Sequence, residues 1–411
     1  MDKPVDKTQE GLTEQEREAL AEENQRLLES NWDQVIPKFE DMGLKKDLLR
    51  GIFGYGFIKP SPIQSKGIPA IIKKKDVIAQ AQSGSGKTAT FSIGCLENID
   101  CDDYKTQALI LAPTRELAIQ INEVVKGIGQ YLKVRTHICT GGTQISDDKA
   151  KLKDGVNIIV GTPGRVRDLI NRQILDTKAL RMLILDEADE MLSKGFLEQI
   201  NEIIKQIPAD CQINLISATI SEEIIKLTKD IMNEPAKILV KKEALTLEGL
   251  KQYYVSCGNE GMKASNLMEI FGGIEISQCI IYVNQKEKAE AVANSLIEKD
   301  FMVGCIHGSL PQEVRNEVMK QFRDGSTRIL VSTDLLARGI DVHQVGLVIN
   351  YELPSKKENY LHRIGRSGRY GRRGIAINLV STNEATALLE LQNFYHTQIK
   401  ELPSDLSELD L

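Results

Sequence analysis

The sequence lacks the features that mark membrane and secreted proteins. No apolar run reaches the roughly 18 residues that a membrane-spanning helix needs. The first residues, MDKPVDKTQEG, contain no apolar stretch of the kind found in a signal peptide. The seven cysteines are an odd number without a CxxC pair, which suits neither a zinc site nor a disulfide framework. We therefore expect an intracellular protein whose cysteines are reduced and lie in its core.

Positive charge is also scarce, because the net charge is −6. The acidity is confined to the two ends of the chain. Residues 1–30 hold nine acidic and four basic side chains, and residues 401–411 hold four acidic side chains and no basic one. The body between them therefore carries +3. A strongly basic nucleic-acid-binding protein is excluded, but a protein that contacts phosphates at a few positions is not.

The 411 residues have the composition of an ordinary globular protein, and their number predicts two or three domains. From Trp32 onward, short runs rich in Ile, Val and Leu alternate with amphipathic segments such as 115–132. This alternation predicts α/β domains with parallel sheets that are covered on both faces. The predicted strands are 76–81, 107–113, 157–163, 181–189 and 212–218, and then 279–284, 303–308, 327–334, 347–354 and 374–380.

The strand series restarts after a short polar stretch, which divides the chain into two domains. We predict an acidic N-terminal tail at 1–30 with a loosely docked helix at 13–29. After this tail we predict a first domain at 31–239, a linker at 240–249, a second domain at 250–403 and an acidic tail at 404–411. Ligands of such sheets bind beyond the carboxyl ends of the strands. The motifs GSGKT, PTRE, TPGR, DEAD, SAT and TDLLARGID follow predicted strands in this way.

The segment AQSGSGKT, Ala81–Thr88, has the pattern of a phosphate-binding loop between a strand and a helix. Glycines allow backbone N–H groups to surround phosphates, and the following helix adds positive potential. Lys87 is expected to reach the β- and γ-phosphates and Thr88 to coordinate Mg²⁺. Ala81 stands where the general motif has its first glycine, so a plain Gly/Ser-rich turn is the alternative interpretation.

The segment LILDEAD places two acids at the end of a predicted strand. An acid in this position can hold Mg²⁺, usually through water, and its neighbour can orient or deprotonate the attacking water. We assign the first role to Asp186 and the second to Glu187. A solvated acidic turn is the alternative, but the phosphate loop about 100 residues upstream argues against it.

Together, the GKT loop and Asp186–Asp189 resemble the DEAD-box RNA helicases, and about ten motifs follow in the order of that family from about Trp32 to Leu402. The resemblance implies two RecA-like parallel-sheet domains in tandem. It also implies an RNA-stimulated ATPase that uses ATP and Mg²⁺ and that binds RNA independently of sequence. The absence of an aromatic stacking platform agrees with sequence-independent binding.

The resemblance assigns the nucleotide site. The segment 56–64 resembles the adenine-recognition motif, in which Gln64 binds the base edge and Phe57 stacks on it. An amide can bond a donor and an acceptor of adenine together, which favours ATP over GTP. The second domain supplies two arginine fingers. The nucleotide-binding set is Phe39, Phe57, Lys59, Gln64, Ser83, Gly84, Ser85, Gly86, Lys87, Thr88, Asp341 and Tyr370, and the catalytic set is Lys87, Asp186, Glu187, Arg366 and Arg369.

The resemblance also implies an RNA track and a set of residues that couple ATP state to duplex opening. Plain turns and a structural domain seam are the alternatives for these motifs. The RNA-binding set is Pro113, Thr114, Arg115, Gly141, Gly142, Thr162, Pro163, Gly164, Arg165, Arg315, Thr333 and Asp334. The coupling set is Asp189, Ser217, Thr219, Gln312, His362 and Arg363.

Two branches of the family share these motifs. ESNWDQ, VIAQAQSG and VKKEALTLEG resemble the translation-initiation branch, whereas Ser367 and Tyr370 resemble the exon-junction branch. The first branch implies a cytoplasmic helicase, monomeric alone, that opens short mRNA duplexes with a scaffold protein and accessory RNA-binding factors. The second implies an ATP-locked RNA clamp and a nuclear location. Ser85 and Arg167 depart from close relatives near functional loops, so nucleotide and RNA affinity are expected to differ.

Overall fold

The computed structural model of the chain covers most of the two predicted domains. The predicted helix at 13–29, the linker at 240–249 and most of the C-terminal tail lie outside the described residues, so the domain boundaries stay predictions. None of the helices within the described ranges is long and apolar enough to cross a lipid bilayer. The structure describes residues 30–81, 84–193, 195–220, 222–239, 250–274, 277–336, 345–365, 374–403, 405–406 and 409.

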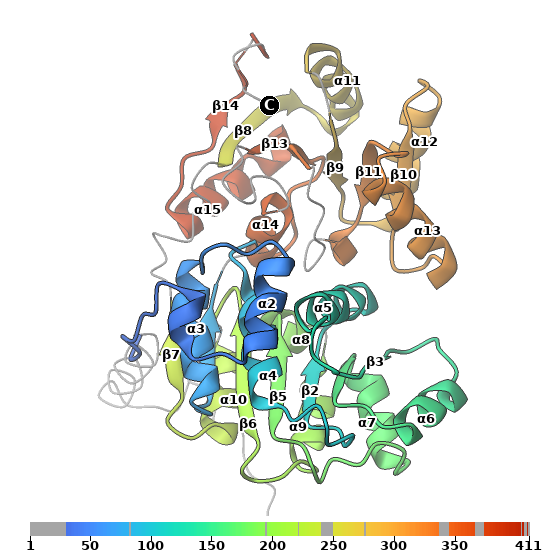
Figure 1. Cartoon of the computed structure of the whole chain (residues 1–411). Helices are drawn as coiled ribbons and strands as arrows, with labels where there is room; N and C mark the ends of the chain where they lie inside the picture. The colour runs from blue at the N-terminus through green and yellow to red at the C-terminus, as the bar shows by residue number, and fades with distance from the viewer. Residues whose placement is uncertain are drawn as a thin grey trace, which may run out of the picture.

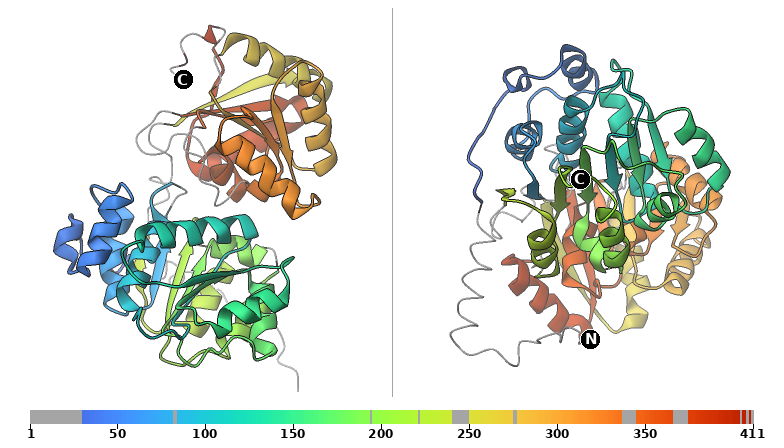
Figure 2. Two further views of the ribbon diagram at one scale, coloured as in Figure 1. Left: turned by 45° about the vertical axis from the view of Figure 1, so that its right-hand side comes forward. Right: turned by 90° about the horizontal axis from the view of Figure 1, so that it is seen from below.

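The strands form two seven-stranded sheets in which every pair is parallel (Figure 1). The strand orders are β3-β4-β2-β5-β6-β1-β7 and β10-β11-β9-β12-β13-β8-β14, so each strand of the first sheet has a topological equivalent seven strands later. The predicted fold class, two parallel-sheet domains in tandem, is confirmed. The left view of Figure 2 shows the two sheets with their helices as two bodies, one above the other.

The first sheet consists of β1 (Val77–Gln80), β2 (Ala108–Leu111), β3 (Thr136–Cys139), β4 (Ile158–Gly161), β5 (Met182–Asp186), β6 (Gln212–Ser217) and β7 (Ala236–Ile238). Its helices are α2 (Lys46–Gly54), α3 (Pro62–Ile72), α4 (Lys87–Asn98), α5 (Arg115–Ile128), α6 (Ile145–Lys153), α7 (Pro163–Asn171), α8 (Ala188–Ser193), α9 (Leu197–Ile204) and α10 (Glu222–Ile231).

The second sheet consists of β8 (Leu250–Gly258), β9 (Cys279–Tyr282), β10 (Val303–Ile306), β11 (Ile329–Ser332), β12 (Leu347–Asn350), β13 (Gly374–Ser381) and β14 (Lys400–Glu401). Its helices are α11 (Lys263–Gly273), α12 (Lys286–Ile297), α13 (Gln312–Arg323), α14 (Lys357–Ile364) and α15 (Ala385–Tyr395).

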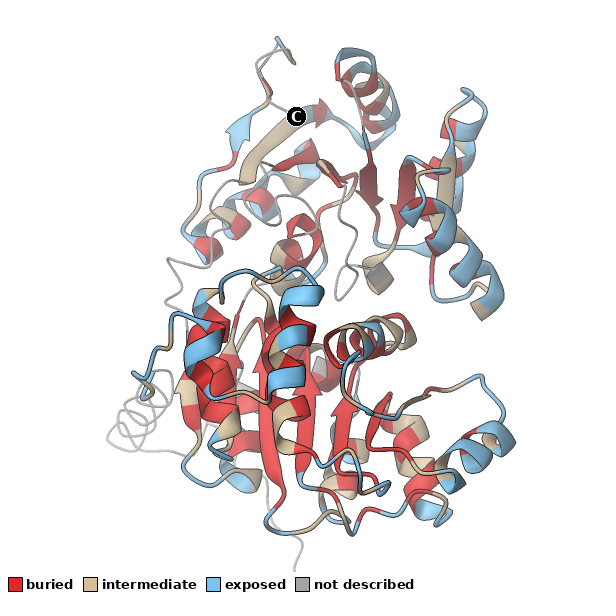
Figure 3. Cartoon of the chain, viewed as in Figure 1, coloured by how far each residue is buried: buried red, intermediate tan, exposed pale blue. Residues whose placement is uncertain are grey.

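The central strands are mostly apolar because helices cover both of their faces, and Figure 3 shows them as buried. In β2, Ala108 and Ile110 face one hydrophobic core, and Leu109 and Leu111 face the core on the other side. This division follows from the two-residue period of a strand. All seven cysteines are free, as expected, and five of them are buried.

Four strands, β3, β7, β8 and β14, were not predicted from the sequence. β8 pairs with β13 along most of its length but is mostly half-buried, with Lys251, Gln252 and two tyrosines among its residues. β3 likewise has only one fully buried residue, Cys139. Strands near the side of a sheet carry polar residues, and their sequences therefore lack the apolar run that revealed the central strands.

Candidate nucleotide and RNA sites

The predicted motifs of the first domain meet at one edge of its sheet. The phosphate loop follows β1, Pro113–Arg115 follows β2, Thr162–Arg165 follows β4, and Asp186 and Ser217 end β5 and β6. Parallel strands place their carboxyl ends together, so segments far apart in the sequence become neighbours. The sheet divides this edge into a β1-β5-β6 side with the GKT and DEAD motifs and a β2-β4-β3 side with the predicted RNA motifs.

The phosphate loop has the backbone geometry that its glycines permit. Gly84 and Gly86 have φ angles of +82° and +95°, a region that side chains disfavour, and α4 begins directly afterwards at Lys87. A Cβ atom on Gly86 would lie 2.6 Å from Gln64 Nε2. Glycine at 86 is therefore favoured by its backbone angle, and a larger residue would also displace the Gln64 amide.

Gln64 connects α3 to this loop. The Ser61 N–H donates to Gln64 Oε1 at 2.9 Å, Ser61 Oγ donates to the Ser85 carbonyl at 2.7 Å, and Gln64 Nε2 donates to the Gly86 carbonyl at 3.4 Å. Ser61 and Gln64 thus form a capping box that also holds the phosphate loop. This placement beside the loop agrees with a nucleotide-binding role, and the contact with adenine stays a prediction.

The aromatic residues assigned to the nucleotide differ in exposure. Phe39 has no exposed surface and packs edge-on against Phe53 with ring centroids 6.4 Å apart. The ring of Phe39 therefore belongs to the core, and its contact with a nucleotide stays a prediction. Phe57 is half-buried and stacks on Tyr55 at 5.5 Å, and Lys59 is exposed.

Lys87 and Glu187 form a buried ion pair at the carboxyl end of β5. Their Nζ and Oε1 atoms are 3.2 Å apart, and both side chains are less than a tenth exposed. Glu187 has a φ angle of +52°, which is uncommon for a residue with a side chain. Such strain persists only where the surroundings hold the residue in place, and it is frequent at functional sites.

Asp186 lies beside this pair and is almost fully buried. Burial raises the pKa of Asp186, the adjacent Glu187 raises it further, and Lys87 lowers it. Carboxylates such as these two, and the hydroxyl of Thr88, which follows Lys87 in the chain, are hard oxygen ligands, the type that Mg²⁺ prefers. The residues at this edge therefore fit a magnesium ion, whose charge would favour the ionised form of Asp186.

Asp189 lies at the seam between the two domains. Thr219 Oγ1 donates to Asp189 Oδ2 at 2.7 Å, and His362 Nε2 of the second domain is 3.7 Å from the same oxygen. Ser217 Oγ donates to the Thr219 carbonyl at 2.7 Å and fixes the turn. Four of the residues predicted to couple the domains therefore meet at one point.

Arg363 was predicted to couple the two domains, but the hydrogen bonds observed for it lie within the second domain. It is fully buried, and its guanidinium donates to Asp334, Asn284 and Asn350 and to the Glu352 carbonyl, which all belong to the second domain. Five fixed donors make arginine suited to join several acceptors in this way. In this structure Arg363 organises the interior of the second domain, and its neighbour His362 makes the contact across the seam.

A groove of about 560 Å³ runs between the domains on the β2-β4-β3 side. Both domains line it, and most of the residues involved belong to the predicted RNA motifs. It is lined by Pro113, Thr114, Arg115, Glu116, Gly141, Thr162, Gly164, Arg165, Asp168, Phe196, Gly308, Arg315 and Leu335. Thr333 and Asp334 directly precede Leu335, at the end of β11.

The two sides of the groove are joined by hydrogen bonds and an ion pair. Arg115 Nη1 donates to Gln312 Oε1 at 3.2 Å, Arg315 Nη1 lies 2.9 Å from Glu116 Oε1, and Gln312 Nε2 donates to the same carboxylate at 3.3 Å. Glu116 was not assigned from the sequence. Its only signal there is its position in PTRE, directly after the assigned residues.

Three arginines, Arg115, Arg165 and Arg315, line the groove together with the acids Glu116 and Asp168. Burial lowers the pKa of Arg115, and the charges of Arg315 and Arg165 lower it further, while Glu116 opposes the change. Three arginines therefore repel one another where a phosphate backbone would relieve the repulsion. Thr114 caps α5 by accepting from the Leu117 N–H at 3.2 Å, and its hydroxyl proton remains able to donate.

Arg165 is held by the first domain itself. Its Nη1 lies 2.6 Å from Asp148 Oδ2, its Nη2 donates to the Thr143 carbonyl, and His137 Nε2 is 2.8 Å from Asp148 Oδ1. Asp148 is almost fully buried. The Gly141–Gly142 turn, which also packs on the Arg115 guanidinium, is thereby fastened to α7.

Replacing Asp148 by asparagine is expected to weaken RNA binding although Asp148 does not line the groove. The amide keeps the shape but removes the charge that orients Arg165, and hydrogen bonds to charged groups contribute about 1.5–3 kcal/mol. We expect a loss of roughly tenfold in RNA affinity, measured by fluorescence anisotropy with an RNA oligonucleotide. Asp147→Asn, on the exposed side of α6, is the control, and equal affinities for the two variants would contradict the role of Asp148.

Several assigned residues are not placed by these contacts. Ser83, Asp341, Arg366, Arg369 and Tyr370 lie outside the described residues, so their roles stay predictions. Arg167, one of the two departures from close relatives, lies on α7 and is 3.5 Å from Glu202 of α9. Both side chains of this pair are about one-third exposed, and the groove lining does not include them, so a large effect on RNA affinity is not expected.

The second sheet has a lysine at the position equivalent to Lys87. Lys263 begins α11 after β8, as Lys87 begins α4 after β1. It is fully buried, with Nζ 2.6 Å from Glu384 Oε2 and 3.0 Å from Glu260 Oε2. Here the chain's own carboxylates surround the lysine, which agrees with a phosphate site in the first domain alone.

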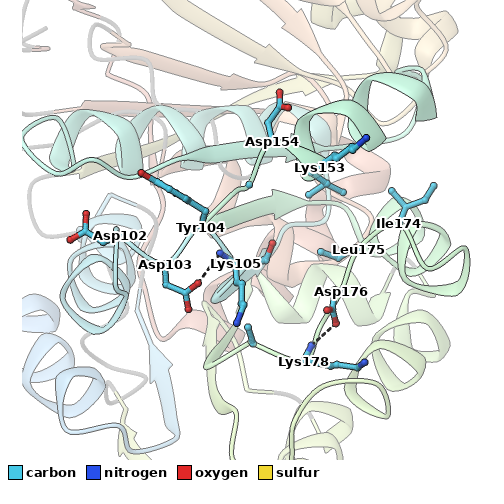
Figure 4. Close-up of a pocket in the computed structure, with 14 residues that line it drawn as sticks. Asp102, Asp103, Tyr104, Lys105, Lys153, Asp154, Ile174, Leu175, Asp176 and Lys178 are labelled. Carbon is cyan, nitrogen blue, oxygen red and sulfur yellow. Dashed lines mark hydrogen bonds between the residues drawn. The ribbon is translucent and has the colours of Figure 1, made fainter.

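A larger hollow of about 820 Å³ lies at the amino ends of β2, β4 and β5, away from all predicted motifs (Figure 4). Both acidic and basic side chains line it. The carboxylates of Asp103 and Asp176 accept from the N–H groups of Lys105 and Lys178, two residues further along the chain. These acids therefore stabilise their own turns.

Comparison with known proteins places the chain among helicases. Residues 61–227 match the DEAD/DEAH box helicase model and residues 262–371 the helicase conserved C-terminal domain. The chain is 50% identical over 383 residues to eukaryotic initiation factor 4A of Caenorhabditis elegans, covering 93% of this chain and 95% of that protein. It is 52% identical over 392 residues to the ATP-dependent RNA helicase eIF4A of Candida albicans, covering 95% and 99%.

A solved structure has the same arrangement of domains. Saccharomyces cerevisiae Dbp5 bound to RNA and ADP BeF3 superposes with a TM-score of 0.85 at 34% sequence identity, covering 90% of this chain and 97% of that one. A DEAD box protein of Methanococcus jannaschii matches with a TM-score of 0.54 at 36% identity. The similarity to the RNA-bound protein extends over both sheets.

Proposed function

This chain belongs to the DEAD/DEAH box helicase family and is an ATP-dependent RNA helicase of translation initiation, and we propose that it works by closing its two domains around one ATP and one RNA strand. The observation that carries this mechanism is the meeting of Thr219, Asp189 and His362 at the seam. Asp189 is three residues from Asp186, so a change at the nucleotide is transmitted to the domain contact over a very short distance.

The first domain binds the nucleotide in this proposal. Backbone N–H groups of the loop 83–88 surround the phosphates, Lys87 leaves Glu187 for the β- and γ-phosphates, and Gln64 with Phe57 holds adenine. Released from Lys87, Glu187 accepts a proton from the attacking water at its carboxylate. Arg366 and Arg369 of the second domain stabilise the charge on the γ-phosphate, and Asp341 and Tyr370 hold the ribose and the base.

In the proposed site, Thr88 and Asp186 would hold magnesium. When bound, it neutralises charge on the transferred phosphate. Asp186 contributes through its fixed position at the end of β5, where the backbone N–H of Glu187 donates to its Oδ1 at 3.0 Å.

RNA occupies the groove between the domains in this proposal. Its phosphates replace arginine–arginine repulsion with attraction, and the track continues over Gly141–Gly142 and Thr162–Arg165 in the first domain and Thr333–Asp334 in the second. The groove exists only when both domains contribute, so a duplex that cannot bend into it loses one strand on closing. These contacts involve the backbone of RNA, which explains binding without sequence preference.

We further propose a cytoplasmic location and a scaffold protein of translation initiation together with accessory RNA-binding factors as partners. The alternative is an ATP-locked clamp in a nuclear RNA–protein complex, which Ser367 and Tyr370 favour. The test is ATP turnover with and without RNA, combined with affinity capture of partners. Strong RNA stimulation and capture of a cap-complex scaffold support the proposal. Capture of exon-junction components instead would support the clamp, and equal stimulation by DNA would contradict RNA specificity.

A further inference from the structure

Two side chains of α14 hold the carboxylate of Asp334. Asn359 Nδ2 donates to Asp334 Oδ2 at 2.9 Å, and Arg363 Nε donates to Oδ1. Residues 359 and 363 are four positions apart and therefore lie on the same face of the helix. The Asp334 side chain is about one-third exposed, so it would turn freely if neither oxygen were held.

The helix that carries these donors is firmly fixed in the second domain. Arg363 is fully buried, and its remaining donors bond Asn284, Asn350 and the Glu352 carbonyl. A charged group that is desolvated and fully hydrogen-bonded is costly to move. The position of α14 therefore determines the orientation of the Asp334 carboxylate.

The same helix also contacts the first domain. His362, between the two donors, is 3.7 Å from Asp189, which in turn accepts from Thr219. Figure 1 shows α14 on the side of the second domain that faces the first. One short helix therefore joins the seam near the nucleotide to the end of β11 near the RNA groove.

From this geometry we propose that Asn359 is a positioning residue for RNA binding, which orients Asp334 when the seam closes. This inference rests on the proposed role of Thr333–Asp334 in contacting RNA. A carboxylate can only accept hydrogen bonds, and the ribose–phosphate backbone offers donors only at its 2′-hydroxyls. The orientation of Asp334 therefore decides whether it binds a hydroxyl or repels a phosphate.

The experiment exchanges the two members of the hydrogen bond. Asn359→Asp places a second carboxylate against Asp334, so the RNA concentration that half-maximally stimulates ATP turnover is expected to rise roughly tenfold or more. Turnover at saturating RNA should stay within about twofold, because Asn359 acts through Asp334. In the double variant Asp334→Asn/Asn359→Asp, the amide again faces a carboxylate, and most of the RNA affinity should return.

Asn393→Asp makes the same change at an exposed position of α15 and is the matched control. Asn359→Ala removes the donor without adding charge and is expected to raise the half-maximal RNA concentration roughly three- to tenfold. It is the variant to use if Asn359→Asp does not fold. The inference is overturned if the Asn359 variants have the same half-maximal RNA concentration as the parent. It is also overturned if the double variant recovers no RNA affinity. A parent protein that RNA does not stimulate would instead overturn the proposed function.

Discussion

Replacing Glu187 by glutamine is expected to slow ATP turnover by roughly 10²- to 10⁴-fold, the usual contribution of a positioned general base. Glutamine has the same shape and its amide oxygen can still accept from Lys87 Nζ, which is 3.2 Å from the present carboxylate. It cannot take the proton of water. ATP binding and the ATP-dependent binding of RNA should therefore persist, and the protein should accumulate in the closed state.

Single-turnover hydrolysis of ATP in the presence of RNA measures the first effect, and RNA anisotropy with ATP measures the second. Glu190→Gln, the same change three residues further along on α8, is the control for altered charge near the site. Hydrolysis by Glu187→Gln at the parent rate would show that another group activates the water.

Replacing Lys87 by methionine is expected to lower kcat/KM for ATP by roughly 10²- to 10³-fold, because a positioned charge on the phosphates is lost. The change should also destabilise the protein by about 3–5 kcal/mol, because Glu187 is buried and loses its counter-charge. Asp186 is adjacent to Glu187, so both of these buried acids would lose the lysine, which now lowers the pKa of Asp186.

The double variant Lys87→Met/Glu187→Gln separates the two effects. It removes the uncompensated charge, so urea denaturation should show that much of the lost stability returns, while ATP turnover stays at least as low as in Lys87→Met. Lys126→Met, on α5, serves as the control for loss of a lysine in the same domain. A stability of Lys87→Met equal to that of the parent would contradict the energetic importance of the buried pair.

Much of the nucleotide site could be predicted from the sequence because its residues belong to short motifs that can each be recognised locally. The loop up to Thr88 and the pair Asp186–Glu187 each follow an apolar run, and a strand end fixes their position. The sequence did not reveal Glu116 or Asp148, since each acts on an arginine from a distant segment. Nor did the sequence show that Phe39 and Arg363 are fully buried, because burial depends on the packing of distant segments.

The sequence by itself determined the family, the parallel tandem fold and the chemical types of the site residues, because strand patterns and short motifs are local properties of the chain. Only the tertiary structure decided which of these residues meet. The pairing of Lys87 with Glu187, the bond of Asn359 to Asp334 and the contact of His362 with Asp189 each join segments brought together by sheet topology and domain packing. Burial then sets the strength of such contacts, because a charge removed from water depends on its partner far more than an exposed one does.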